Sequence, residues 1–168
     1  EQVGRESYDP NTKVNPPLRS RADVDAVIEA LSEGLIDIIA TDHAPHAETD
    51  KVCTYDEAAH GINVLETAFS SVFELVGGSK ISLNRLIESL TASPAKILNR
   101  DLGSLKQGFS ADVAIIDPTS KWVVNPQEFI SKSANSPLDG VELTGRVVRT
   151  IYQGETVFDM VTSAGARA

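Results

Sequence analysis

The sequence predicts an α/β fold over residues 1–100 and a mostly β fold over residues 101–168. In the first part, apolar residues recur at helical spacing around a short apolar run rich in β-branched residues, an order typical of parallel α/β folds. In the second part, Val- and Ile-rich runs follow one another, separated by Gly- and Pro-containing turns. The chain therefore divides into two structural parts, and the sequence contains no internal repeat.

The first elements are a loop and a helix with both ends marked. Residues 1–12 are polar and contain Asp-Pro, which predicts a loop, and the prolines of "KVNPPLR" predict extended backbone. Ser20 and Asp23 then fit a capping box, and Gly34 is placed to end a helix. The apolar residues between them have helical spacing: Val24, Val27, Ile28 and Leu31.

A buried strand and three further helices are expected next. The run "LIDIIA", residues 35–40, has the composition of a buried parallel strand, and a loop over 41–61 follows it. A second helix is expected to carry Leu65, Ala68 and Phe69 on its apolar face and to end at Gly77-Gly78, and a third begins at Ser82. Ser93 and Pro94 fit the N-cap and first position of a short fourth helix.

Beyond Asn99 the pattern changes to strands. The runs are "ADVAIID", "KWVV", "RVVRTIY" and "ETVFD", and the last two are expected to form a hairpin around Gln153-Gly154.

Composition limits the classes of partner. A formal charge of −9 and a pI near 4.7 argue against nucleic acid and anionic membrane surfaces, so a small molecule or a protein is the expected partner. No apolar run approaches the roughly 18 residues of a membrane span, and no signal-peptide pattern is present. Cys53 is the only cysteine. These features favour the cytoplasm, and a start at Glu1 without Met suggests a piece of a longer chain.

The stretch "TDHAPH", Thr41 to His46, is the main candidate for chemistry. It places Asp42 and two of the three histidines directly after "LIDIIA". In an α/β barrel the functional residues lie at the C-terminal ends of the strands. A whole barrel takes about 250 residues, so most of one would lie upstream of Glu1.

Several residues around this stretch are suited to binding or catalysis. Asp42 can bind a divalent metal through one oxygen and move a proton with the other, although an Asp here can equally cap a turn. His43 and His46 need not both face a site, because neighbouring loop side chains can point apart. Asn15 in "NPPLR" offers an amide to a ligand, and Gly61 permits close backbone approach. Each can instead be an ordinary loop residue.

Taken together, six motifs in order resemble the C-terminal portion of a class I dihydroorotase of the amidohydrolase superfamily. They are "KVNPPLR", "IDIIATDHAPH", "GINVLET", "TASPAKIL", "GSLKQGFSADVAIID" and "ANSPLDGVELTGRVVRTIYQGE".

The resemblance implies a metal-dependent (β/α)8 TIM barrel joined to a small β-sandwich domain. Residues 1–100 would supply the last strands and helices of the barrel, and 101–168 the C-terminal share of the composite β domain. Such enzymes interconvert N-carbamoyl-L-aspartate and L-dihydroorotate in pyrimidine biosynthesis.

The resemblance also implies site roles and partners. Asp42 would ligate one of one or two zinc ions and act as general acid and base. Asn15, His46, His60 and Gly61 would bind substrate, and His43 would support them. The missing N-terminal part of the barrel is the expected partner, with a homodimer or a transcarbamoylase complex possible.

The sequence departs from the family pattern in two ways. His60-Gly61 stands where the family commonly has Phe-Gly, and the other metal ligands are absent, so we expect the chain alone to be inactive. The alternatives are a dihydropyrimidinase or allantoinase, against which Asn15 and His46 argue, and a non-catalytic dihydroorotase-like scaffold subunit of a transcarbamoylase.

Overall fold

The computed structural model describes residues 8–161 of the chain. The helices are α1 (Arg21–Glu33), α2 (Ala68–Gly77), α3 (Leu83–Leu90) and α4 (Ala92–Ile97), and short 3-10 helices are η1 (Pro10–Thr12), η2 (Glu48–Asp50) and η3 (Pro126–Glu128). The strands β1 (Val113–Val123), β2 (Glu142–Tyr152) and β3 (Glu155–Asp159) form an antiparallel sheet in that order. No helix among the described residues is long and apolar enough to cross a membrane.

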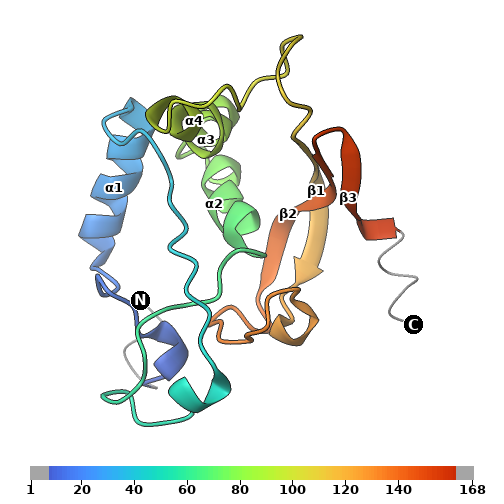
Figure 1. Cartoon of the computed structure of the whole chain (residues 1–168). Coiled ribbons are helices and arrows are strands. Elements are labelled where there is room, and N and C mark those ends of the chain that lie inside the picture. The colour runs from blue at the N-terminus through green and yellow to red at the C-terminus, as the bar shows by residue number, and fades with distance from the viewer. Residues whose placement is uncertain (1–7, 162–168) are drawn as a thin grey trace.

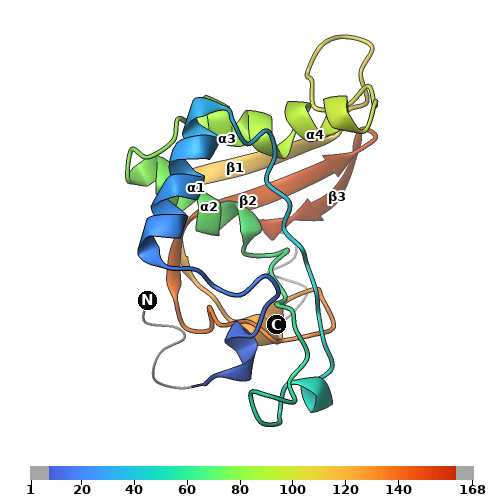
Figure 2. The same ribbon diagram turned by 90° about the vertical axis from the view of Figure 1, so that its left-hand side faces the viewer.

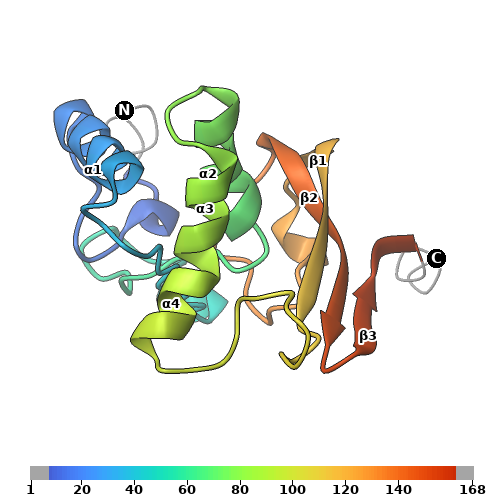
Figure 3. The same ribbon diagram turned by 90° about the horizontal axis from the view of Figure 1, so that it is seen from above.

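The elements lie in three layers (Figure 3). Helices α2, α3 and α4 occupy the middle, with α1 on one side and the sheet on the other. A buried cluster of Leu31, Ile81 and Leu86 joins α1 to the middle layer. The loops that carry the candidate site residues extend from these layers to one end of the molecule, near η1 and η2 (Figures 1 and 2).

Helix α1 confirms the capping prediction. The Ser20 side chain accepts from the Asp23 N–H while the Asp23 carboxylate accepts from the Ser20 N–H, so two of the helix's otherwise unpaired donors are satisfied. Gly34 ends the helix with φ of 80°, in the left-handed region that glycine adopts without steric cost.

Helices α2 and α4 begin at other residues than expected. Helix α2 begins at Ala68, so Leu65 precedes it, in a turn, and is exposed. The N–H groups of Val64 and Leu65 donate to the His43 ring. Helix α4 has Thr91 as its N-cap instead of Ser93. Pro94 is tolerated at the third helical position because the N–H there has no partner within the helix in any case.

Residues 35–40 are the clearest correction to the predicted fold. They form no strand: Ile39 donates to the Ser89 carbonyl, and Leu35 is 75% exposed. A parallel strand requires neighbours that take up its backbone N–H and C=O groups, and no strand lies beside this segment within residues 8–161. An apolar composition alone does not supply these partners.

The sheet packs against α2 through a glycine. A Cβ at Gly145 of β2 would lie 2.7 Å from Phe73 Cδ1 and 3.3 Å from Phe69 Cε1, so glycine allows the stacked rings of α2 to approach the strand. Ser70 Oγ donates to the Gly145 carbonyl (2.5 Å) and accepts from Trp122 Nε1 (3.3 Å). The helical and β parts thus share one packed interface, and the predicted boundary near residue 100 stays a prediction.

The predicted strands are present, with one difference in number. The runs "ADVAIID" and "KWVV" belong to a single strand, β1, whose register with β2 shifts between Asp117 and Lys121. The hairpin between β2 and β3 is confirmed. Gln153 and Gly154 both have positive φ, 51° and 87°, as a two-residue turn of type I′ requires.

Candidate active site

Four of the five predicted site residues surround one cavity of about 200 Å³. They come from three separate segments: Asn15 follows η1, Asp42 lies in the loop after residues 35–40, and His60 and Gly61 lie in the loop before α2. The remaining lining residues are Val14, Pro16, Thr41, Ile62 and Val64. Folding therefore brings together residues that are up to 46 positions apart in the sequence.

Asp42 presents a carboxylate without a protein partner. Its φ of 49° is in the left-handed region, which Asp and Asn tolerate better than most residues. Within residues 8–161 the carboxylate makes no hydrogen bond or ion pair, so it does not cap the following turn. The carboxylate is free to bind a cation or to exchange a proton with a ligand in the cavity.

Asn15 is likewise exposed, and its side-chain amide has no partner within the described range. The amide offers one acceptor and two donor hydrogens beside Asp42. A ligand that combines carbonyl and N–H groups could pair with both ends of it.

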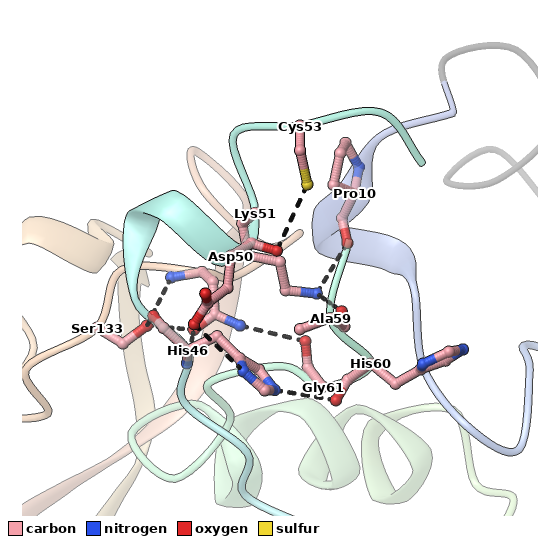
Figure 4. Close-up of polar contacts among 10 residues, drawn as sticks. Pro10, His46, Asp50, Lys51, Cys53, Ala59, His60, Gly61 and Ser133 are labelled. Atoms are coloured by element: carbon pink, nitrogen blue, oxygen red, sulfur yellow. Dashed lines mark hydrogen bonds and ion pairs between the residues drawn. The ribbon is translucent and has the colours of Figure 1, made fainter. Parts of the chain in front are cut away.

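His46 is not among the residues that line the cavity, but it contacts one of them. Its Nε2 is 3.0 Å from the His60 carbonyl oxygen (Figure 4), and because a carbonyl can only accept, Nε2 carries the hydrogen of this bond. Its Nδ1 is 4.0 Å from Asp50 Oδ2, an ion pair only when the ring is protonated. The ring thus supports the loop that carries His60 and Gly61.

His43 also supports a loop. Its Nδ1 faces the N–H groups of Val64 (3.3 Å) and Leu65 (3.2 Å) and therefore accepts from them. The ring hydrogen then belongs on Nε2, which is 3.3 Å from Ser131 Oγ. This geometry agrees with the supporting role that the sequence suggested for His43.

Gly61 is closely packed in the cavity wall. Its φ is +147°, and a Cβ there would lie 2.6 Å from Ala44 Cβ and 2.7 Å from His46 Nε2. Its N–H donates to the Lys13 carbonyl (2.9 Å) and its carbonyl accepts from Asn135 Nδ2 (3.1 Å). The Gly61 N–H is therefore occupied, and a ligand can use only a second lone pair of the carbonyl.

Sequence reasoning missed Lys51 and Asn135, two buried residues that hold the site loops. Lys51 Nζ donates to the carbonyls of Pro10 (2.9 Å) and Ala59 (2.7 Å), which joins η1 to the residue before His60. Burial lowers the pKa of Lys51 below its ordinary value. Asn135 lies in the run "SKSANSP", and small polar residues between strands usually indicate only a loop.

The donor set fits a metal in part. Asp42 offers a free carboxylate oxygen of the kind that divalent cations bind. Among residues 8–161, however, no group of three or more His, Cys, Asp or Glu side chains lies close enough to hold a metal ion. Asp42 can therefore serve as one ligand, and a metal centre requires others.

Known proteins match the chain along most of its length. The amidohydrolase family matches residues 10–157. The chain is 49% identical over 150 residues to a dihydroorotase of Thermoanaerobacter sp. (strain X514), covering 89% of this chain and 35% of that protein. It is 44% identical over 152 residues to a dihydroorotase of Syntrophus aciditrophicus (strain SB), covering 90% and 36%.

Solved structures share the fold. An L-hydantoinase (dihydropyrimidinase) from Arthrobacter aurescens superposes with a TM-score of 0.85 at 33% identity, covering 91% of this chain and 35% of that one. A dihydropyrimidinase from Brevibacillus agri NCHU1002 superposes with a TM-score of 0.84 at 22% identity, covering 94% and 36%. The chain thus spans about a third of the length of the relatives that it matches.

Proposed function

The chain belongs to the amidohydrolase family, and from this premise we propose that it forms part of a dihydroorotase. The enzyme would interconvert N-carbamoyl-L-aspartate and L-dihydroorotate in pyrimidine biosynthesis. The observation that carries the proposal is the convergence of Asn15, Asp42, His60 and Gly61 on one cavity, in a chain whose dihydroorotase relatives are 43–49% identical.

Asp42 is the proposed acid and base. A divalent metal ion, zinc in our proposal, would polarise the amide carbonyl and acidify water when bound. Asp42 would hold that ion through one carboxylate oxygen and accept the proton of the attacking water through the other. In ring opening it would then return the proton to the leaving nitrogen, and ring closure reverses these transfers. The absence of any competing partner for Asp42 within residues 8–161 supports this role.

Asn15, Gly61 and His46 are the proposed substrate-binding groups. The Asn15 amide can pair with the ureido or ring amide groups, and the Gly61 carbonyl can accept a substrate N–H. His46 would act from the edge of the cavity, where its ring already contacts the His60 carbonyl. His60 would contact the substrate from the cavity wall, which it lines together with Asn15 and Asp42.

The proposal extends to the whole enzyme. Residues 1–100 would complete a (β/α)8 barrel whose earlier strands supply the remaining metal ligands, and residues 101–168 would complete a composite β-sandwich domain. We place this enzyme in the cytoplasm, as a homodimer or in complex with a transcarbamoylase. The relatives are about three times as long as this chain, which supports the proposal that further barrel strands belong to the whole enzyme.

A hydantoinase or dihydropyrimidinase activity is the second candidate. It is favoured by the Arthrobacter aurescens L-hydantoinase, which is 33% identical and has nearly the same backbone over this region. The substrate of that class is also a cyclic amide, so Asp42 would play the same part. The higher identity of the dihydroorotases, up to 49%, favours the first candidate.

A substrate comparison tests the proposal. The protein that contains this chain and the complete barrel is purified with zinc and assayed in both directions with L-dihydroorotate, dihydrouracil and hydantoin. We expect the highest kcat/KM for L-dihydroorotate and for its ring-opened form. A higher kcat/KM for dihydrouracil or hydantoin would select the second candidate. No turnover of any of the three by the zinc-loaded protein would support a scaffold subunit instead.

A further inference from the structure

The connection between η3 and β2 contacts both loops that carry the candidate site residues, although it lies far from them in the sequence. Within this connection Asn135 is 6% exposed and Ser136 is 4% exposed, although both are polar. Buried amides are retained where their hydrogen bonds fix neighbouring backbone. The contacts of Asn135 therefore indicate what this connection holds in place.

The Asn135 side chain bridges the two loops of the cavity. Its Oδ1 accepts from the His46 N–H (3.1 Å), in the loop that contains Asp42. Its Nδ2 donates to the Gly61 carbonyl (3.1 Å), in the loop that contains His60. Its own main-chain carbonyl accepts from the Asn63 N–H (2.9 Å). One residue thus satisfies backbone groups on both sides of the cavity.

The neighbouring serines extend the same contact. Ser133 Oγ lies within hydrogen-bond distance of two acceptors, the His46 carbonyl (2.8 Å) and Asn135 Oδ1, between which its single hydrogen is shared. Ser131 Oγ is hydrogen-bonded to His43 Nε2. The segment 131–135 therefore contacts both histidines of "TDHAPH" but not Asp42 itself.

Other contacts also join the two loops directly. A parallel bridge pairs His43 with Ile62, with the Ala44 N–H donating to the Ile62 carbonyl (3.0 Å). The His43 ring accepts from the N–H groups of residues 64 and 65, and the His46 ring contacts the His60 carbonyl. Asn135 adds a link from outside both loops. The amide of Asn135 contacts main-chain atoms of both loops at once, the His46 N–H and the Gly61 C=O.

We infer that Asn135 is a positioning residue of the proposed dihydroorotase, which sets Asp42 and Gly61 at their working separation by bridging His46 N–H and Gly61 C=O. The inference rests on the proposed function. Misplacement of a reacting group by about 1 Å can cost about 100-fold in rate, and loss of supporting partners commonly costs about 10–100-fold. The β part of the chain thereby contributes to catalysis without touching substrate.

The test compares Asn135→Ala, Asn135→Gln and Asn125→Ala in the complete zinc-loaded protein. Asn125 is the matched control, because its amide also bonds neighbouring groups, Gln127 N–H and Glu128 Oε1, but at η3 and away from the cavity lining. We expect Asn135→Ala to lower kcat about 10–100-fold, with a smaller change in KM and unchanged zinc content. Asn135→Gln keeps an amide, on a side chain longer by one methylene, and should therefore retain part of the wild-type kcat. Asn125→Ala should keep kcat within about twofold.

Hydrogen exchange gives a readout that does not depend on turnover. Asn135→Ala should accelerate exchange of the His46 N–H and of the amides at 61–63 together, whereas Asn125→Ala should change neither. Unchanged exchange in both loops, or a loss of kcat explained entirely by a lower folded fraction, would overturn the inference. If the wild-type protein turns over none of the substrates, the proposed function fails, and the exchange data still decide whether Asn135 ties the loops.

Discussion

Asp42 is exposed to the cavity because its backbone adopts a conformation that few residues tolerate. With φ of 49° the chain turns sharply after Thr41, and the carboxylate is left without a partner among the described residues. Asp and Asn are several-fold enriched in this region relative to other residues with a Cβ. Asp42 therefore suits both the backbone turn and the proposed proton transfer. Asn suits only the turn, so a substitution by Asn separates the two roles.

Asp42→Asn should lower kcat strongly without destabilising the fold. Asn keeps the preference for positive φ but removes the proton acceptor, so kcat should fall about 10²–10⁴-fold in both directions. The free energy of unfolding should change by less than about 0.5 kcal/mol, as for other exposed substitutions. Steady-state kinetics, zinc content and thermal unfolding measure these effects.

Asp37→Asn is the matched control for this variant, because Asp37 is also exposed and lies five positions earlier in the same extended segment. It should leave kcat unchanged. A fully active Asp42→Asn enzyme would remove Asp42 from the mechanism.

Gly61 is required by space as well as by conformation. In Gly61→Ala the new Cβ would meet Ala44 Cβ at 2.6 Å, His46 Nε2 at 2.7 Å and the Ala44 carbonyl oxygen at 2.9 Å. The loops of Asp42 and His60 must then move apart, which we expect to cost about 1–3 kcal/mol of stability and to lower kcat/KM at least tenfold.

Gly140→Ala separates the effect of backbone strain from the effect of a steric clash. Gly140 has φ of +75° and nothing within 4 Å of an added Cβ, so this variant carries backbone strain without a clash. It should cost about 1 kcal/mol and leave kcat/KM unchanged. Equal losses of kcat/KM in both variants, measured at a temperature where each is folded, would contradict the packing argument.

At the scale of the element, α1 shows how local electrostatics define a boundary. Hydrogen bonds from the Ser20 side chain and backbone lower the pKa of Asp23 below its ordinary value of 3.8. Because the folded-state pKa is lowered, the stabilisation from Asp23 is present above pH 3.8 and is lost as the pH falls through the lowered value. Acid should therefore loosen the first turn of α1.

Ser20→Ala tests this coupling. It removes the largest cause of the shift, so the pKa of Asp23 should return toward 3.8, and the lost cap should cost about 1 kcal/mol at neutral pH. The difference in stability between variant and wild type should shrink as the pH falls from 3.8 through the lowered pKa of wild-type Asp23, below which the carboxylate is protonated in both. An NMR titration of the Asp23 carboxyl in both proteins decides the matter, and an identical pKa in the two would reject the coupling.

The elements differ in how well the sequence predicts them. Helix α1 is predicted in full because its apolar spacing, its N-cap and its Gly34 end are all local signals. Residues 35–40 were predicted as a strand and are not one, because strand formation depends on partners that composition does not reveal. The same limit applies to Asn135: its partners at His46 and Gly61 lie 89 and 74 positions away, so no local pattern points to them.

At the scale of the whole molecule, the most telling feature is the amount of apolar surface. Large apolar side chains are exposed on every layer, including Val27 of α1 at 56%, Ile97 of α4 at 60% and Val157 of β3 at 60%. Contiguous apolar surface on a folded protein usually marks a contact with further protein. Together with relatives about three times as long, this surface supports the proposal that the chain packs against barrel strands supplied by the rest of a longer protein.

The chain and its complement should therefore form the metal site only together. Asp42 is a single ligand, so the 18.0 kDa chain purified alone should bind no stoichiometric zinc and show no turnover. Adding a polypeptide that supplies the upstream part of the barrel should give a complex with about one or two zinc ions and restored activity, and Asp42→Asn should prevent the recovery of activity. Intact mass under denaturing conditions identifies which polypeptides are present, and metal analysis of the same sample counts the zinc. Stoichiometric zinc on the 18.0 kDa species alone would mean that other residues of this chain complete the site, and the barrel proposal would have to be abandoned.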